Sequence, residues 1–421
     1  MQTGHSAKTP TPRPAPEPAY AWVVVWAAFA SLALIFGVAY SFAAFFQSFA
    51  AEFSAQRADV SLVFGLTGLI YFGFGAMGGM LSDRFGPRLV CGAGMVCIAL
   101  GLLAASLSTS LLAVYLSYGV AIGFGIALVY TPAIGSVLPW FTQRRGLAAG
   151  IASAGIGLGT VLVPLLATAA ISALDWRMAL RLMGAGVLVS GLLATGLLKR
   201  APVAVPGGAK PGAAGRETAA TAPAPPGGAT LRQALHDKRF WWFYLFTFTA
   251  APTMFIPFAH VSASARDIGV HEASAVGLVG LIGIGSLIGR FAIGALADKL
   301  GRMQTLTLAQ VSMAATYLLW MAAGGYPALA IFALWFGLSY GGIVSLMPAI
   351  CMDMFGARAV SSIVGTLYTA AALGNLVGPV VAGAVFDRSG SYTAVMWGCL
   401  ALSVLATGAA ARIIRIRGAV F

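Results

Sequence analysis

The sequence predicts an all-α membrane protein in which twelve transmembrane helices form two parallel six-helix repeats. Three observations predict this fold: the composition, a series of long apolar runs, and an internal repeat. Of the 421 residues, 59% are hydrophobic and only 9% are charged, and the mean hydropathy is +0.89. Soluble domains carry about 25% charged residues. The composition therefore predicts that a lipid bilayer surrounds most of the chain.

Twelve apolar runs follow one another along the chain. Each is long enough to cross a bilayer as a helix, which takes about 20 residues. The first run is too long for the apolar core of a signal peptide, so we expect it to remain as a helix. The expected spans are 21–46, 60–81, 89–108, 111–138, 146–170, 178–198, 240–264, 273–297, 303–323, 327–352, 360–385 and 391–412.

These runs divide the chain into two bundles and three polar segments. Residues 19–198 are expected to form an N-terminal six-helix bundle and residues 240–412 a C-terminal one. Between them, residues 199–239 predict a flexible linker, because the middle of this segment is rich in Ala, Pro and Gly. Residues 1–18, which are Pro-rich and expected to be disordered, and residues 413–421 form the two tails.

The Lys and Arg residues predict the orientation. With a cytoplasmic N-terminus, most of the 25 basic residues fall on the cytoplasmic side, as expected for a membrane protein. We therefore expect both termini and the linker in the cytoplasm, and a bacterial-type inner or plasma membrane as the location. The net charge of +13 is spread over loops and tails, so it does not indicate nucleic-acid binding. The four cysteines have no metal or disulfide spacing, and we expect no cofactor.

An internal repeat relates the two bundles. Two separate sets of residues recur at one offset of 215 residues, which predicts parallel repeats related by an axis along the membrane normal. The first set is Gly79-x-x-x-Asp83-Arg84-x-Gly86, which recurs as Gly294-x-x-x-Asp298-Lys299-x-Gly301, and the second is Gly150, Gly159 and Pro164, which recur as Gly365, Gly374 and Pro379.

Arg290 is the one basic residue that this topology leaves inside the membrane. It precedes Asp298 by eight residues, or roughly 12 Å at 1.5 Å per residue. A charge at this depth is costly, so such residues usually face a cavity and serve a function. Because the other membrane segments hold no acidic residue, we expect a site for a small anion. The alternative is a structural arginine bonded to backbone carbonyls. The equivalent position in the first repeat is Gly75, and this asymmetry favours a site.

The segment from Gly79 to Arg88 resembles the signature loop between helices two and three of the major facilitator superfamily. A carboxylate at a helix end can pair with basic partners and hold helices together in one state of a transport cycle. The alternative is a simple surface turn. We expect gating roles, rather than substrate contacts, for Asp83, Arg84, Arg88, Arg144, Asp298, Lys299 and Arg302.

Two further stretches resemble the signatures of the monocarboxylate transporter family. One is Tyr20-Ala-Trp22, which enters the first helix, and the other runs from Trp140 to Gly155 and enters the fifth. This resemblance covers nearly the whole membrane region. It implies transport of a small monocarboxylate such as lactate or pyruvate, often with a proton, and it matches Arg290 to the family's carboxylate-binding arginine. The alternative is an anion exchanger like the related oxalate/formate antiporters.

Two positions depart from the animal members of that family. Ser286 stands where those members have an aspartate, and Tyr40 where they have a lysine. The run that begins at Tyr368 has no lysine, whereas the oxalate relatives carry a second cation there. A guanidinium grips one carboxylate with two hydrogen bonds, so a single cation favours a monocarboxylate over a dicarboxylate.

Other polar groups complete the expected site. We expect Ser286, Tyr118, Tyr340 and Tyr40 to bond the anion or its hydroxyl group, although a membrane tyrosine can also pack in a core or at an interface. His260 is expected near the outer end of its helix. It could titrate near physiological pH and take part in proton coupling, or it could be structural.

The expected mechanism is proton-coupled symport by rocking of the two halves. The membrane segments lack a conventional carboxylate relay, and anion exchange would need no proton site. A receptor is disfavoured because the chain shows no soluble signalling domain. An enzyme is disfavoured because we find no nucleophile–base pair, metal cluster or phosphate loop. The outer loops are short, so we expect no obligate protein partner.

Overall fold

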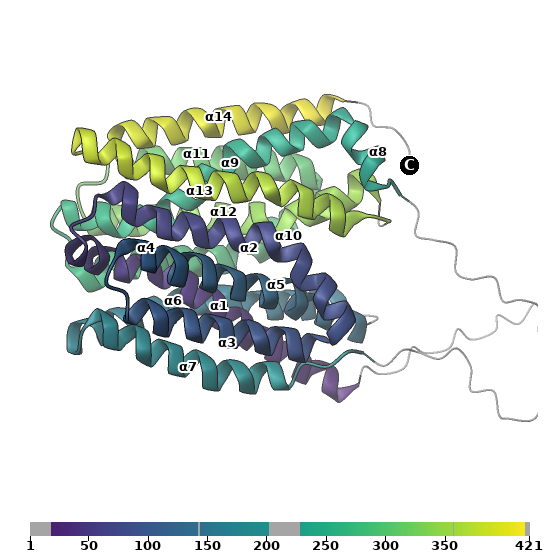
Figure 1. Cartoon of the computed structure of the whole chain (residues 1–421). Coiled ribbons are helices and arrows are strands. Elements are labelled where there is room, and N and C mark those ends of the chain that lie inside the picture. Colours follow the sequence, from purple (N-terminus) through teal and green to yellow (C-terminus); the bar gives the residue numbers. More distant parts are fainter. Residues whose placement is uncertain (1–17, 142–143, 202–227, 357, 417–421) are drawn as a thin grey trace, which may run out of the picture.

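The computed structural model describes residues 18–141, 144–201, 228–356 and 358–416, and nearly all of them are helical (Figure 1). The long helices lie side by side, and their ends gather at two opposite ends of the molecule. The elements are α1 (Ala19–Glu52), α2 (Arg57–Phe85), α3 (Pro87–Ser106), α4 (Leu111–Val114), a π-helical segment η1 (Tyr115–Ile122), α5 (Gly123–Val137), a 3-10 turn η2 (Leu138–Trp140), α6 (Arg145–Ala173), α7 (Trp176–Gly196), α8 (Leu231–His236), α9 (Lys238–Asp267), α10 (Glu272–Leu300), α11 (Arg302–Met321), α12 (Tyr326–Phe355), α13 (Val360–Ser389) and α14 (Thr393–Arg415).

Eleven helical segments of the described chain are long and apolar enough to cross a membrane. The elements α4, η1, α5 and η2 form one of them, Leu111–Trp140. The expected span at 303–323 is present as the 20-residue helix α11, which packs against α12 and α14. Its apolar character is diluted by polar residues such as Gln304 and Gln310. The crossing of α11, and with it the count of twelve, stays a prediction.

The helix boundaries repeat as the sequence motifs do. α2, α3 and α6 begin at positions 57, 87 and 145, and α10, α11 and α13 begin 215 residues later. At the end of α2 and of α10, Gly86 and Gly301 have φ of 91° and 90°. This conformation costs little only in glycine, so both helices stop at equivalent points.

Glycines also permit the closest helix contacts. In α6, a Cβ added to Gly159 would lie 1.9 Å from the Ala33 carbonyl oxygen of α1. The backbones can approach this closely only because no side chain intervenes, as is common between membrane helices. The two halves, α1–α7 and α8–α14, meet through α2 with α13 and through α6 with α10.

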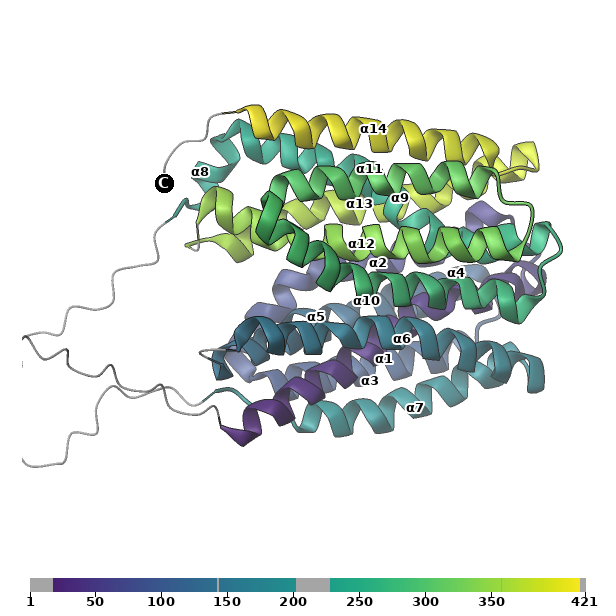
Figure 2. The ribbon, with the colours of Figure 1, turned by 180° about the vertical axis from the view of Figure 1, so that it is seen from behind.

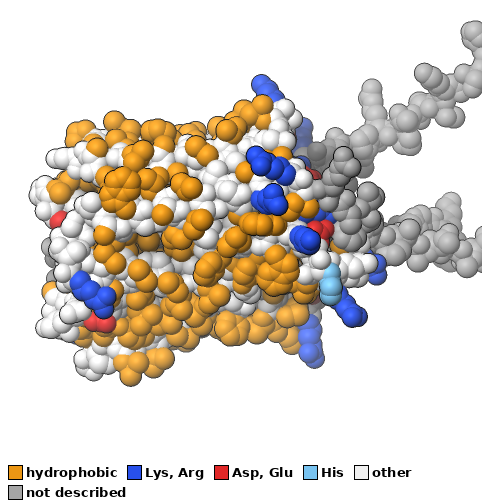
Figure 3. Space-filling model, turned by 90° about the horizontal axis from the view of Figure 1, so that it is seen from above, with side chains coloured by type: hydrophobic (Ala, Val, Ile, Leu, Met, Phe, Trp, Pro, Cys, Tyr) orange, Lys and Arg blue, Asp and Glu red, His pale blue; other side chains and the backbone are white. Residues whose placement is uncertain are grey.

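Figure 1 places the start of α1, the end of α14 and both described ends of the linker on one side of the molecule. We call this side the linker end and the opposite side the far end. Figure 2 shows the same arrangement from behind. In Figure 3 apolar side chains cover most of the visible length of the bundle, and Lys and Arg gather at the linker end. A membrane protein with a basic side has this distribution.

The last part of the expected linker, 228–239, is ordered. Ala229 N–H donates to the Phe355 carbonyl at 2.7 Å, and Thr230 caps α8 in a reciprocal capping box with Gln233. Burial alone would raise the pKa of Asp237, which caps α9. Hydrogen bonds from the Arg239 side chain and backbone outweigh this effect, so the pKa of Asp237 is lowered from its ordinary value. Of the segment 1–18 that was expected to be disordered, residues 1–17 lie outside the described chain, as do the linker residues 202–227 and the tail residues 417–421.

Candidate functional site

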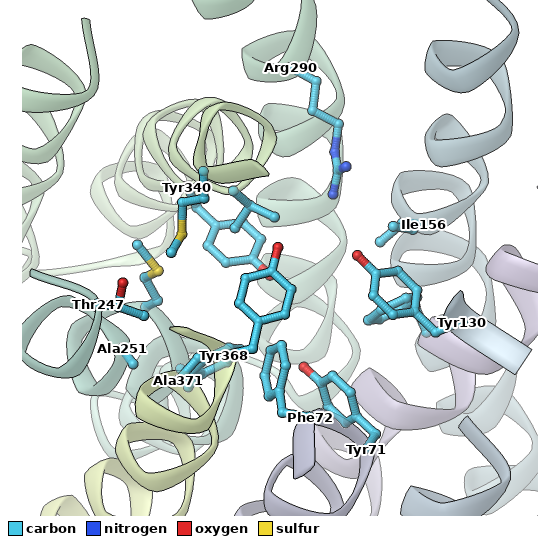
Figure 4. Close-up of a pocket in the computed structure, with 15 residues that line it drawn as sticks. Tyr71, Phe72, Tyr130, Ile156, Thr247, Ala251, Arg290, Tyr340, Tyr368 and Ala371 are labelled. Carbon is cyan, nitrogen blue, oxygen red and sulfur yellow. The ribbon is translucent and has the colours of Figure 1, made fainter. Parts of the chain in front are cut away.

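A pocket lies between the two halves (Figure 4). Most of its lining residues lie in the middle part of their helices. It encloses about 620 Å³ of empty space, counting its open mouth. Helices α1, α2, α5 and α6 line it from one half, and α9, α10, α12 and α13 from the other. The lining residues are Phe36, Tyr71, Phe72, Tyr130, Ile156, Thr247, Ala251, Met254, Phe255, Arg290, Tyr340, Val344, Met347, Tyr368 and Ala371.

Arg290 is the one charged residue among these lining side chains. It is half-buried in α10, and Figure 4 shows its guanidinium directed into the pocket. In the described chain, Arg290 forms no ion pair with a carboxylate and donates no hydrogen bond to a protein group. The effective dielectric constant inside an apolar pocket is lower than in water. An unpaired cation there therefore attracts an anion more strongly than it would in water.

Three tyrosines that the sequence analysis did not assign also line the pocket. Tyr71 comes from α2, Tyr130 from α5 and Tyr368 from α13, and Figure 4 shows their hydroxyl groups facing the interior. Within the described residues these hydroxyls have no protein hydrogen-bond partner. They therefore offer donors to a bound molecule. The signal that the sequence offered for each of them was a tyrosine inside an apolar run.

Tyr340 and Tyr40 lie together across the two halves. Tyr340 lines the pocket, and its hydroxyl is 3.2 Å from that of Tyr40. The Tyr40 ring stacks on Phe258 of α9, with centroids 4.2 Å apart. Tyr40 is thus one hydrogen bond away from the pocket and joins α1 to α12 and α9.

Two other expected ligands lie outside the pocket lining. Ser286 is 4% exposed on the side of α10 that packs against Gly341 of α12. Tyr118 is fully buried, and its hydroxyl donates to the Val38 carbonyl at 2.8 Å. Tyr118 therefore joins η1 to α1 within the first half.

His260 lies at the far end, also outside the pocket, and is fully buried. Its Nε2 is 2.8 Å from the Pro379 carbonyl oxygen, which can only accept, so Nε2 carries the proton. Its Nδ1 is then free to accept from the Tyr392 hydroxyl at 2.9 Å. Nε2 is also 3.1 Å from Ser61 Oγ of α2, so His260 bridges the halves.

An arginine that the sequence analysis did not assign organises the far end. Arg57 Nη2 is 2.6 Å from Asp267 Oδ1, and Nη1 donates to the Tyr392 hydroxyl at 2.8 Å. The two Asp387 carboxylate oxygens accept from the backbone N–H groups of Arg57 and Ala58 at 3.0 and 2.9 Å. These contacts close the far end, because Arg57 belongs to the first half and its partners to the second.

The expected gating residues lie at the linker end. Asp83, Arg84, Arg88, Asp298 and Lys299 are exposed. Arg302 bonds Asp353 and so acts within its own half. Arg200, from the start of the linker, donates to the Ser82 carbonyl at 2.6 Å and also to the carbonyl of Asp83.

Arg144 is exposed at the N-cap of α6. The hydrogen bonds that join the two halves lie at the far end and near the middle of the long helices, away from these expected gating residues.

Repeated bundles of membrane-length helices around a pocket that both halves line define a membrane transporter. The sequence matches the Major Facilitator Superfamily over residues 27–379 and, in a second match, over residues 246–419. It is 32% identical to monocarboxylate transporter 13 of Rattus norvegicus, over 89% of this chain and 84% of that protein. It is 31% identical to monocarboxylate transporter 11 of Homo sapiens, over 95% and 85%. The chain belongs to the major facilitator superfamily and, within it, to the family of the monocarboxylate transporters.

Two further likenesses agree with this assignment. The MFS-type transporter opdF of Penicillium oxalicum is 28% identical, over 99% of this chain and 95% of that protein. Among solved structures, a bacterial homologue of the human lysosomal transporter Spinster, described as inward-facing and unoccupied, matches with a TM-score of 0.70. It is 16% identical and covers 94% of this chain, so it shows a shared fold.

Proposed function

We propose that this protein is a proton-coupled symporter of a small monocarboxylate such as L-lactate or pyruvate. The observation that carries the proposal is Arg290, a single cation without a carboxylate partner in the described chain, facing a pocket that both halves line. Matching one charge to one carboxylate leaves the remaining, apolar wall for the alkyl part of the substrate. The names of the relatives in rat and human support the same substrate class.

In the proposed binding step, the planar guanidinium of Arg290 donates two parallel hydrogen bonds to the substrate carboxylate. Tyr340 and the unpartnered hydroxyls of Tyr130 and Tyr368 supply donors for a hydroxyl or oxo oxygen at the neighbouring carbon. Such contacts fix the orientation of the anion and exclude the water that would otherwise screen its charge.

In the proposed transport step, the two halves rock about this pocket. We place the linker end in the cytoplasm, because Lys and Arg gather there. The contacts of Arg57 with Asp267 and Tyr392 then belong to a gate that is closed toward the outside. Opening this gate while the linker end closes would expose Arg290 to the other side of the membrane.

The proton step involves groups outside the pocket. No carboxylate lies among the described residues that line it. His260 is titratable, fully buried and placed between the halves, so it is our candidate for a group whose protonation is linked to the cycle. The same lack of a carboxylate favours one alternative, an oxalate/formate-type anion exchanger, which needs no proton site.

Uptake of labelled L-lactate into proteoliposomes tests the proposal. We expect an inward proton gradient to stimulate uptake by the wild-type protein and Arg290→Gln to abolish it. Arg388→Gln, at an exposed arginine near the end of α13, is the matched control and should transport normally.

The outcomes separate the alternatives. Uptake that ignores the gradient but is stimulated by preloaded dicarboxylate would replace symport by exchange. Uptake that survives Arg290→Gln would show that Arg290 is not the carboxylate ligand.

A further inference from the structure

The walls of the pocket are more aromatic than a three-carbon anion requires. Seven of its fifteen lining residues carry aromatic rings, and one carries a charge. Lactate or pyruvate could bond Arg290 through its carboxylate but has no ring to stack on these side chains.

The aromatic rings are concentrated away from the charge. Figure 4 shows Arg290 at one end of the pocket, Phe72 and Tyr71 toward the other, and the hydroxyls of Tyr130 and Tyr368 between them. The ring centroid of Phe72 lies 5.6 Å from that of Tyr368 and 5.7 Å from that of Phe255. Helices α2, α9 and α13 therefore supply one continuous aromatic surface. An elongated ligand with its charge at one end fits this gradient of polarity.

The aromatic lining continues onto α1 and α5. Phe36 of α1 meets Tyr130 of α5 edge to face, at 5.3 Å and 84°. Phe36 also meets Tyr71, at 6.1 Å, and Tyr71 meets Phe72, at 4.1 Å, so these rings form one connected surface. A planar ring that lies against this surface can make the offset or edge-to-face contacts that aromatic groups prefer. The intermediate hydroxyls of Tyr130 and Tyr368 have no protein partner among the described residues, so they remain available to an oxygen close to the carboxylate.

We propose that the preferred substrate is an aromatic monocarboxylate with a 2-oxo or 2-hydroxy group. Its carboxylate binds Arg290, the oxygen at the second carbon bonds Tyr130 and Tyr368, and its ring packs against Phe72. This inference rests on the proposed function, since it names the class of monocarboxylate that the same site takes.

Ligand-induced thermal stabilisation of the purified protein tests this inference. The ligands are phenylpyruvate, phenyllactate, pyruvate, L-lactate and, as an uncharged control, 2-phenylethanol. We expect phenylpyruvate to reach half-maximal stabilisation at a concentration about tenfold lower than pyruvate, because added aromatic contacts and apolar burial of this size are worth about that factor. 2-Phenylethanol should have no effect over the same range.

Two variants locate the effect. Phe72→Leu should reduce the preference for phenylpyruvate over pyruvate to about twofold. Phe74→Leu, on the same helix but 43% exposed and outside the pocket lining, should leave the preference unchanged. The preference in the wild-type protein is itself a test that does not depend on either variant folding.

The outcomes distinguish this inference from the proposed function. Stabilisation by pyruvate at concentrations equal to or below those of phenylpyruvate overturns the aromatic preference and leaves a monocarboxylate transporter. Stabilisation by none of the four acids overturns both. Equal stabilisation by 2-phenylethanol overturns the role of the carboxylate.

Discussion

At the scale of single residues, the site depends on a break in the internal symmetry. Arg290 and Gly75 are equivalent in the two repeats, and so are Ser286 and Tyr71. The first half therefore offers a tyrosine hydroxyl to the pocket, and the second half offers the charge. A symmetric pair of arginines would repel each other in an apolar medium and would suit a dianion. The observed arrangement suits an anion of single charge.

Tyr118 provides a test of how the tyrosines divide between site and scaffold. Its hydroxyl donates to the Val38 carbonyl within the first half, and it lies outside the pocket lining. We expect Tyr118→Phe to lower stability by about 1 kcal/mol, the net value of one buried hydrogen bond, and to leave the KM for substrate unchanged. Tyr130→Phe should show the reverse, a raised KM with near-normal stability. Thermal unfolding in detergent and uptake kinetics measure the two effects, and a raised KM in Tyr118→Phe would contradict this division.

The sequence could identify Arg290 but not the tyrosines around it. A charge inside an apolar run is conspicuous because its burial is costly. Tyrosine is common in membrane helices, and these helices are apolar on all sides. The usual helical periodicity therefore does not distinguish a side chain that faces lipid from one that faces a pocket. Tyr71, Tyr130 and Tyr368 became recognisable only when the packing of α2, α5 and α13 placed them around one space.

At the scale of elements, the helices are positioned by close contacts at glycine. Gly155 and Gly159 of α6 lie against the carbonyl groups of Phe29 and Ala33 of α1. Their spacing of four residues puts both on one face of the helix. The contact between α1 and α6 therefore has little room for any side chain along this face.

Paired substitutions at glycine test this arrangement. In Gly159→Ala the new Cβ would lie 1.9 Å from the Ala33 carbonyl oxygen, so α1 and α6 must separate. We expect a loss of about 1–3 kcal/mol and a clearly lower unfolding temperature. Gly186→Ala in α7 is the control, because nothing lies within 4 Å of its added Cβ. Alanine favours helix by about 0.5–1 kcal/mol over glycine, so this variant should be neutral or more stable. Equal unfolding temperatures for both variants would contradict the role of the contact.

Element boundaries were predictable where the repeat or a glycine marked them. Gly86 and Gly301 end α2 and α10 at equivalent positions, as the recurring motif implied. The helix α8 was not predicted, because six residues beside an Ala/Pro/Gly-rich segment carry no apolar periodicity. Its available signal was the capping box of Thr230 and Gln233.

At the scale of the whole molecule, the structure has one end closed by specific bonds between the halves. The network of Arg57, Asp267, Asp387 and Tyr392 lies at the far end, and His260 with Ser61 lies beside it. Closely packed interfaces of this kind tend to have two discrete arrangements rather than a continuum. Composition and repeats could predict that two halves exist. They could not predict which end is closed, because the side-chain bonding partners of Arg57 lie 210 or more residues away in the chain.

Weakening this network should shift the protein toward a conformation that is open at the far end. The Asp387 carboxylate accepts the first backbone N–H groups of α2, which carry the partial positive charge of a helix N-terminus. Asn at this position loses the charge and one of the two acceptors. We therefore expect Asp387→Asn to increase access to groups now buried between the halves. A suitable reporter is Phe46→Cys, since Phe46 is 1% exposed and packs edge to face on His260 across the interface.

The measurement is the rate at which a membrane-impermeant maleimide labels this cysteine, in a background from which Cys91, Cys97, Cys351 and Cys399 have been removed. Each hydrogen bond to a charged group is worth about 1.5–3 kcal/mol, so labelling should accelerate at least severalfold. Asp175→Asn is the matched control, because Asp175 also caps a helix but bonds Met178 within its own half. The same acceleration in both variants would attribute the effect to general loosening, and none in Asp387→Asn would mean that other contacts hold the far end closed.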